Sequence, residues 1–395
     1  MPAQFVIFGA TLAGVAIFNR RALPLAAAGL AVVIAYEWLF ATFPAGPGLA
    51  GLAAHFSHEW VILANLFLLL VGFALLAAQF ERSGLPRMLP RFLADDWTGG
   101  VALLAIVFVL SAFLDNIAAA LIGGAMAHTL FRARVRVGYL AAIVAAANAG
   151  GAGSVIGDTT TTMMWISGVA PRQVLHAYVA AIVAFLAFAL QAARAQHRFS
   201  PIIRDAPAAF AVDWLRVAAV AFILASAVAV NVGVNERYPD LAGRFPFIGA
   251  AVALATLISS AWRRPDFRVL PGAVKGSIFL LCLVASASLM PVASLPAASW
   301  QSTLALGFVS AFFDNIPLTA LALKQGGYDW GVLAYAVGFG GSMIWFGSSA
   351  GIAICNMYPE ARSTGRWLRE GWPVVAAYVA GFAALLATLG WNPGG

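Results

Sequence analysis

The amino-acid sequence predicts an all-α polytopic membrane protein made of two inverted-topology repeats, with two re-entrant hairpins and two broken transmembrane helices. Three features predict this fold: the composition, the distribution of basic residues and a duplicated motif. The 395 residues are 62% hydrophobic and 10% charged, with a mean hydropathy of +0.89. A soluble domain carries about 45–50% apolar and about 25% charged residues. The composition therefore excludes a soluble enzyme, a nucleic-acid-binding protein and a disulfide-stapled domain.

Apolar runs separated by basic or Pro/Gly-rich joints predict the membrane segments, since about 20 apolar residues cross a bilayer. They lie at 4–18, 22–43, 60–80, 100–130, 138–168, 173–193, 212–231, 245–262, 275–292, 299–325, 330–356 and 371–391. Two of these runs, 100–130 and 299–325, are interrupted by an Asp-Asn pair and are expected to be re-entrant hairpins. Two others, 138–168 and 330–356, contain Gly-rich interruptions and are expected to be broken spans.

The basic residues support the two hairpins. If 100–130 enters the membrane from the inside and 299–325 enters from the outside, all but four of the 23 Lys and Arg residues fall on one side. The four exceptions are Arg172, Arg237, Arg244 and Lys324. Basic residues accumulate in cytoplasmic joints. This distribution predicts an N-terminus outside, and treating either hairpin as a full crossing destroys the segregation.

A duplicated motif divides the chain into two repeats, 1–210 and 211–395. Ser-Ala-Phe-Leu-Asp-Asn-Ile at 111–117 returns as Ser-Ala-Phe-Phe-Asp-Asn-Ile at 310–316, and a Gly-rich broken span follows each copy. With the topology above, the first repeat starts outside and the second starts inside, which is the plan of secondary transporters. Glycine and alanine could instead serve close helix packing, but that alternative leaves the repeated Asp-Asn unexplained.

Three carboxylates, Asp115, Asp158 and Asp314, lie deep inside apolar runs. A charged side chain at the bilayer centre costs roughly 2.5–3.5 kcal/mol on insertion scales, so an ion or proton role is the default interpretation. The alternative is that each carboxylate caps a broken helix. Hydroxyl and amide oxygens surround these acids in the sequence, and such hard oxygens suit a small cation. The candidate ion-binding and proton-coupling residues are Asp115, Asn116, Asn148, Asp158, Thr159, Thr160, Asp314, Asn315, Ser348 and Ser349, with Asp115 and Asp158 as the expected sodium ligands.

The two repeats differ in their acids. Aligning Ile156-Gly157-Asp158-Thr159 with Phe346-Gly347-Ser348-Ser349 places a serine opposite Asp158. The tighter cation site is therefore expected in the first repeat, and Asp314 is expected to complete it, gate it or carry a coupling proton. The run Thr159–Thr162 supplies hydroxyls, and at least two of these are expected to bond back to the preceding turn. No Lys or Arg lies at comparable depth, which counts against an anion site.

These motifs resemble the ion transporter superfamily, and within it the NhaD-type sodium:proton antiporters. The matching segments are Ser111–Ile117, Gly150–Trp165, Ser310–Thr319, Gly340–Met343 and Gly347–Gly351. The resemblance implies a scaffold domain, a transport domain with both hairpins, homodimers in the lipid bilayer and an elevator-like movement. It also implies a bacterial inner-membrane location. The chain departs from the family at Ala118-Ala119-Ala120, where threonines usually follow the first Asp-Asn.

The expected function is exchange of sodium or lithium for protons by alternating access, without a cofactor or enzymatic activity. Burial disfavours an isolated carboxylate and a bound cation stabilises it, so protons and sodium compete for the same acids. One alternative is sodium-coupled uptake of a small carboxylate or inorganic anion, with the anion held at broken-helix N-termini. Another is a structural or assembly protein in which these acids have lost their role.

Overall fold

The computed structural model describes residues 2–18, 21–203, 211–238, 241 and 243–393. Regular structure within these residues is helical, and no strand occurs in them. In the part of the chain that the structure describes, six helical segments are long and apolar enough to cross a membrane: Ala22–Phe40, Gly48–Arg82, Pro171–Phe199, Trp214–Val234, Phe267–Ser288 and Thr364–Leu389. The all-α polytopic membrane fold is therefore confirmed.

The helices form two groups by their contacts. The first group contains α1 (Ala3–Ile17), α2 (Ala22–Phe40), α3 (Gly48–Arg82), α11 (Trp214–Arg237), α13 (Phe247–Ser259) and α14 (Leu270–Ser288). Within it, α3 packs against α11, α13 and α14, and α2 packs against α1 and α14. The short elements α4 (Leu85–Met88), η2 (Leu89–Phe92), η3 (Phe267–Val269) and η4 (Val292–Ser294) lie at its connections.

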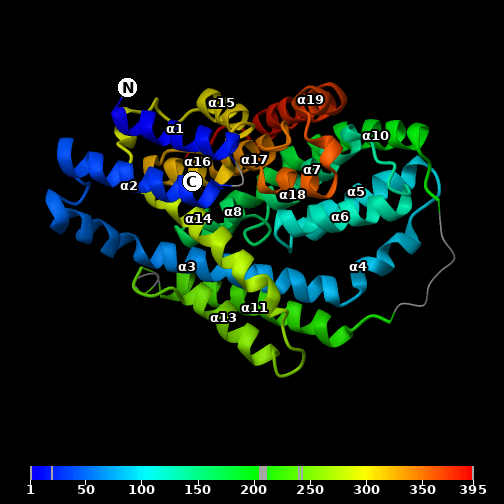
Figure 1. Cartoon of the computed structure of the whole chain (residues 1–395), viewed down its shortest axis with the longest axis horizontal. Helices are drawn as coiled ribbons and strands as arrows, with labels where there is room; N and C mark the ends of the chain where they lie inside the picture. The colour runs from blue at the N-terminus through cyan, green and yellow to red at the C-terminus, as the bar shows by residue number, and fades with distance from the viewer. Residues whose placement is uncertain (1, 19–20, 204–210, 239–240, 242, 394–395) are drawn as a thin grey trace.

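The second group contains the interrupted segments. It comprises α5 (Trp97–Ser111), α6 (Asn116–Leu130), α7 (Val137–Ala152), α8 (Thr159–Ile166), α9 (Pro171–Leu175), α10 (Ala177–Phe199), α15 (Trp300–Ser310), α16 (Asn315–Gln325), α17 (Trp330–Gly340), α18 (Ser349–Met357), η5 (Pro359–Ala361) and α19 (Thr364–Leu389). In Figure 1, α3, α11 and α13 of the first group lie at the bottom, whereas α1 and α2 lie at the upper left near α15 and α16 of the second group. All four interruptions occur where the sequence predicts them, between α5 and α6, α7 and α8, α15 and α16, and α17 and α18. The inverted membrane orientation of the two repeats remains a prediction.

The third membrane segment is longer than predicted. The sequence places it at 60–80, after an outer joint, but α3 already begins at Gly48. Polar residues near the start of α3 interrupt the apolar run of the sequence, but the helix continues through them. His55 is buried with its Nε2 2.9 Å from Ser288 Oγ, and His58 Nδ1 lies 2.7 Å from the Ala54 carbonyl oxygen within the same helix. Tertiary contacts therefore extend the helix past a segment that hydropathy assigns to a loop.

Two central helices carry the interrupted segments into the core of the second group. Every residue of α7 except Gly138 is buried, and every residue of α17 except Trp330 is buried. The two helices pack against each other, and both are rich in alanine and glycine, which lets backbones approach closely. Their C-terminal ends therefore bring both interruptions to the same region of the interior.

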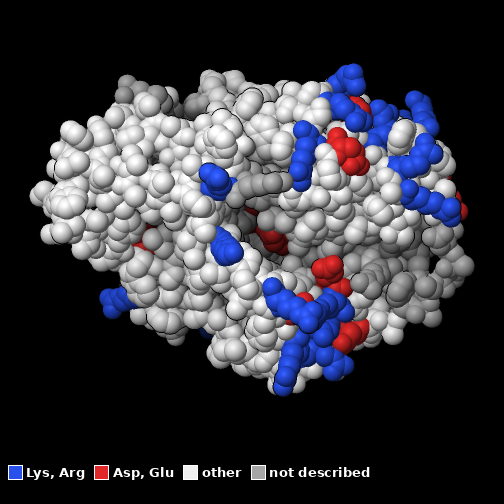
Figure 2. Space-filling model, in the orientation of Figure 1, with Lys and Arg blue, Asp and Glu red and all other residues white. Residues whose placement is uncertain are grey.

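On the face drawn in Figure 2, most basic side chains lie toward the right-hand part of the molecule. They gather over the right-hand ends of α10 and α19 and below, near the connection after α13. The side of the membrane on which these residues lie stays a prediction. Arg20, Arg204 and the predicted repeat boundary at residue 210 lie outside the described residues.

Candidate functional site

Four helix N-termini meet at the interruptions, and each begins with one of the predicted polar residues. Asp115, Asp158, Asp314 and Ser348 are the N-cap residues of α6, α8, α16 and α18. Asp314 caps its own helix by accepting from Ile316 N at 3.1 Å, and Ser348 accepts from Gly351 N at 3.2 Å. Asp115 and Asp158 make no side-chain cap hydrogen bond. Helix capping therefore accounts for Asp314 more fully than for the two acids of the first repeat.

The two halves repeat the same contacts around these N-termini. Ser111 Oγ donates to the Ala147 carbonyl at 2.5 Å, and its counterpart Ser310 Oγ donates to the Val337 carbonyl at 2.7 Å. Each bond ties the end of a first helix, α5 or α15, to the middle or end of α7 or α17. The duplicated sequence thus has duplicated packing.

Glycine is required where these helices touch. A Cβ on Gly150 would collide with the Phe108 carbonyl, and a Cβ on its counterpart Gly340 would collide with the Gly307 carbonyl. Gly157 and Gly347 are restricted in the same way by the backbone after α5 and α15. These close approaches explain the Gly-rich sequence of both broken spans, because a larger residue would push each Asp-Asn turn away from the site.

Asp158 is the centre of the hydrogen-bond network. It is 3% exposed, and its Oδ2 accepts from Thr160 Oγ1 at 2.5 Å and from Asn315 Nδ2 at 3.3 Å. Its Oδ1 accepts from Asn116 Nδ2 at 3.3 Å. Both Asn residues of the duplicated Asp-Asn motif therefore reach the same carboxylate, one from each half of the chain.

Asn148 joins the first broken span to the second. It accepts from Asn116 Nδ2 at 3.1 Å, and its own Nδ2 donates to Ser342 Oγ at 2.9 Å and to Ser348 Oγ at 3.3 Å. Ser342 belongs to the network, although it is not among the predicted site residues and lies only in the matching segment Gly340–Met343. Ser342 could have been found as a polar residue within the long apolar run 330–356, at the position that Ala152 occupies in the first half.

Asp314 and the threonines that follow Asp158 bond to different partners. Ser349 Oγ donates to Asp314 Oδ2 at 3.0 Å, so Asp314 pairs with the second repeat and is not hydrogen-bonded to Asp158. Thr161 and Thr162 each donate to the Asp158 carbonyl at 2.9 Å, which confirms that two of the four threonines bond back to the backbone. Thr159 lies beside the cavity described next.

A cavity of about 240 Å³ separates this network from α3 and α14. Its polar wall comes from the site, and its opposite wall is formed by apolar and small residues of α3 and α14. The polar lining residues are Asp115, Asn116, Asp158, Thr159, Asn315 and Ser349, with Ser277 on the opposite side. Figure 2 shows a hollow near the middle of this face with acidic atoms inside it. Asn148, Thr160, Ser348 and Asp314 are not among the lining residues.

The cavity offers oxygen ligands without a basic counterpart. Among the described residues, no Lys or Arg forms an ion pair with Asp115, Asp158 or Asp314. The same residues contain no group of three or more His, Cys, Asp or Glu side chains placed to hold a metal ion together. The ligands that this cavity offers to a cation are the carboxylates of Asp115 and Asp158 with nearby amide and hydroxyl oxygens, the oxygen ligands that hard cations prefer.

The chain matches no family model. It is similar to two known proteins. Sodium/proton antiporter 1 of Arabidopsis thaliana is 27% identical over 328 residues, which are 71% of this chain and 54% of that protein. Sodium/proton antiporter 2 of the same plant is 27% identical over 312 residues, 66% of this chain and 69% of that protein. The chain spans about half the length of the first relative. Both names describe transporters, and the similarity lies within the function class that the sequence predicts.

Proposed function

We propose that this protein is a secondary active transporter that exchanges sodium, or lithium, for protons by alternating access. One observation carries the proposal: Asp115 and Asp158 line one cavity within the membrane-spanning region and have no basic partner among the described residues. The names of the two Arabidopsis relatives support sodium and protons as the transported ions.

Competition between the two ions follows from the surroundings of the carboxylates. Neutral donors from Asn116, Asn315 and Thr160 surround Asp158, but they do not neutralise its charge. Two carboxylates facing one small cavity repel each other, so a proton or a cation stabilises the pair. If the site can change sides only when its carboxylates are neutralised, it carries sodium in one direction and protons in the other. This cycle exchanges the two ions.

The helix N-termini argue for a cation and against an anion. N-termini carry partial positive charge and attract anions. Here α6, α8 and α16 each begin with an aspartate of the chain, and only α18 begins with a neutral residue, Ser348. An incoming carboxylate would meet resident carboxylates at three of the four ends. Sodium-coupled anion uptake is therefore a weaker hypothesis than sodium:proton exchange.

The cavity extends toward the end of the molecule that we assign to the cytoplasm. Its apolar wall contains Ala77 of α3, near Arg82, and Gly272 of α14, next to the basic joint after α13. On the other side, Ile316 and Ala320 of α16 pack in one apolar cluster with Leu66 of α3 and further residues of α14. We infer that this arrangement is an inward-facing state with a closed outer barrier.

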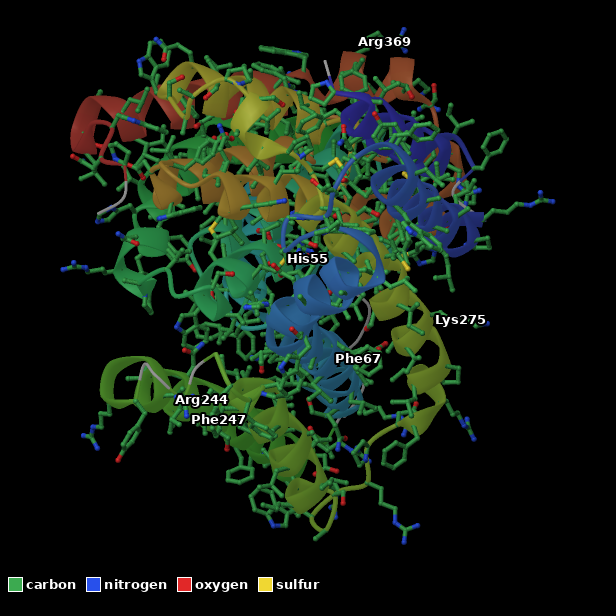
Figure 3. The ribbon with its side chains drawn as sticks, turned by 90° about the vertical axis from the view of Figure 1, so that its left-hand side faces the viewer. His55, Phe67, Arg244, Phe247, Lys275 and Arg369 are labelled. Atoms are coloured by element: carbon green, nitrogen blue, oxygen red, sulfur yellow. The ribbon has the colours of Figure 1, made fainter. Side chains whose placement is uncertain are left out.

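A polar contact reinforces that barrier. Lys324, at the end of α16, donates to the Ser288 carbonyl at 2.5 Å and to the Met290 carbonyl at 2.6 Å, at the end of α14. His55 reaches the same residue, with its Nε2 2.9 Å from Ser288 Oγ. Figure 3 looks from the left-hand end of Figure 1 and places His55 near the centre, where α3 meets the upper helices. Opening toward this side would require α16 to leave α14.

The finer features of the transport unit are proposals as well. We take the group with α3 and α14 as the scaffold and the group with the interrupted helices as the moving domain, each drawn from both repeats, 1–210 and 211–395. A homodimer in the inner membrane of a bacterium, with the N-terminus outside and elevator-like movement, is the arrangement that the resemblance implies.

The decisive experiment measures proton flux in proteoliposomes that carry a preset pH gradient. Sodium, lithium, potassium and then succinate or citrate are added in turn to wild type and to Asp158→Asn. Collapse of the gradient by sodium or lithium, absent in the variant, is the expected result. If sodium or lithium collapses the gradient only when succinate or citrate is also present, sodium-coupled anion uptake replaces exchange as the function. If no addition collapses the gradient in wild type, the transporter proposal is wrong. If sodium collapses it equally in wild type and in Asp158→Asn, the assignment of Asp158 to the ion site is wrong.

A further inference from the structure

We propose that a crevice between α7, α10 and α19 binds the phosphate of one anionic phospholipid in the membrane leaflet on the basic side of the protein. The crevice is separate from the ion cavity and has a volume of about 340 Å³. None of its lining residues belongs to the candidate ion site. Its ligand would be a lipid component of the membrane and not a transported ion.

The crevice combines a charged rim with an apolar interior. Arg136, before α7, and Arg369, in α19, contribute guanidinium groups, while Gln191 of α10 adds an amide. Deeper residues such as Phe188 and Val374 are apolar and fully or almost fully buried. A phosphate diester with an acyl chain matches this arrangement, because its charge would meet the rim and its hydrocarbon would cover the interior.

The charges at the rim leave an excess of positive charge. Glu370 is the one acid in the lining, and its Oε2 lies 3.5 Å from Arg136 Nε while its Oε1 lies 3.6 Å from Arg366 Nη2. Gly138 N also donates to Glu370 Oε2 at 3.4 Å. Glu370 is therefore shared between two arginines and holds Arg136 at the crevice. Arg369 has no side-chain hydrogen bond or ion pair within the described residues, so its planar donor group is available to a phosphate.

The position of the crevice favours a lipid over a soluble anion. It lies at the ends of α10 and α19, where basic side chains gather in Figure 2, and Arg369 lies at the upper edge of the molecule in Figure 3, away from His55 and α3. Trp372, also in the lining, is 56% exposed, as expected for an interfacial tryptophan. Such a place is reached from the bilayer by a lipid headgroup.

The test measures lipid retention by the full chain in detergent. Native mass spectrometry and thermal unfolding are recorded with phosphatidylglycerol, phosphatidylcholine, glycerol 1-phosphate or inorganic phosphate added. Two variants address different walls: Arg369→Gln removes a charge at the rim, and Ala192→Phe fills the crevice without changing charge. Arg268→Gln is the matched control, because it removes an exposed arginine on the same side of the membrane but outside the crevice.

The expected result is one bound phosphatidylglycerol held more tightly than phosphatidylcholine. Arg369→Gln should weaken this binding about tenfold, since it removes a charged donor group that would contact the phosphate, and Ala192→Phe should weaken it at least as much. Arg268→Gln should leave it unchanged. Equal binding in Arg369→Gln, in folded Ala192→Phe and in wild type would overturn the proposal. Full competition by glycerol 1-phosphate or inorganic phosphate at the concentration of the lipid would also overturn it, in favour of a soluble-anion site.

Discussion

Asn315 donates a hydrogen bond through Nδ2 to Asp158 Oδ2 at 3.3 Å and so links the second Asp-Asn turn to the carboxylate of the first broken span. Asn148 makes the reciprocal connection from the first half to Ser342 and Ser348 in the second. Each half therefore completes the polar network of the other. A change in the charge of Asp158 acts directly on both interrupted segments.

The first prediction concerns Asp158. Replacing it with asparagine keeps the size of the side chain and removes the charge, so sodium-dependent proton flux should fall at least about tenfold, the loss expected for charge-assisted contacts. Flux in proteoliposomes measures this directly. Asp329→Asn is the matched control. Asp329 is also buried, but it caps α17 by accepting from Gly331 N and Val332 N at 3.1 Å and lies outside the cavity. Its variant should transport normally, and equal losses in both variants would contradict the assignment.

The second prediction separates Asp115 from Asp314. Asp115 lines the cavity, whereas Asp314 is held by Ser349 Oγ and Ile316 N and does not. Asp115→Asn should abolish exchange, while Asp314→Asn should retain part of it with an unchanged number of protons per sodium. Parallel measurements of sodium uptake and charge movement give that ratio. Loss of exchange in Asp314→Asn with normal folding would mean that Asp314 takes part directly in the transport cycle, as a proton carrier or as an ion ligand.

Much of this arrangement could be predicted from sequence. The repeated Asp-Asn pairs and the glycines beside them predict where the four helices break, because both features are local. The sequence predicts that Asn148, Asp158, Asn315 and Ser348 share one site, but the individual hydrogen bonds could not be predicted. The bonded partners lie 194, 200 and 157 residues apart, and no spacing encodes the pairing. The helical start of α3 was missed for the same reason: His55 is accommodated by Ser288, 233 residues later.

The third prediction concerns the outer contact of Lys324. Removing its ammonium group in Lys324→Gln takes away two charge-assisted hydrogen bonds to α14 and should shift the protein toward an outward-facing state. A cysteine placed at Ser349, in a chain lacking Cys282 and Cys355, reports this shift through labelling by an impermeant maleimide from outside. Labelling should rise about tenfold, from a loss of about 1.5 kcal/mol.

The control for this shift is Lys275→Gln, which alters the same helix α14 near its opposite end. Labelling of the Ser349 cysteine should stay at the level of the parent in that variant. Unchanged labelling in Lys324→Gln would mean that the contact with Ser288 and Met290 does not hold the outer barrier. A rise in both variants would point to general loosening of α14.

The fourth prediction concerns the glycines beneath the two Asp-Asn turns. Gly157→Ala and Gly347→Ala would force a methyl group against the backbone after α5 and α15, and each should lower the free energy of unfolding by about 1–3 kcal/mol, the usual cost of overpacking. Gly233→Ala in α11 is the control, because no neighbouring atom lies within 4 Å of its added Cβ. Thermal unfolding of purified protein compares them. A normal melting temperature in both site variants would show that the turns are not tightly seated.

The fifth prediction concerns Asp213, which precedes α11 outside the membrane segment. Its Oδ2 accepts from Arg263 Nε at 2.8 Å, and this bond holds the pKa of the Asp213 carboxyl below its usual range. A carboxyl with a lowered folded-state pKa stabilises the fold above its unfolded pKa of about 3.9, and the contribution is lost as the pH falls through the folded value. Asp213→Asn should therefore lower the melting temperature at pH 7, and the difference from wild type should shrink progressively as the pH falls below about 4. A difference that is the same at pH 7 and pH 3 would mean that Asp213 stabilises α11 through its shape as an N-cap and not through its charge.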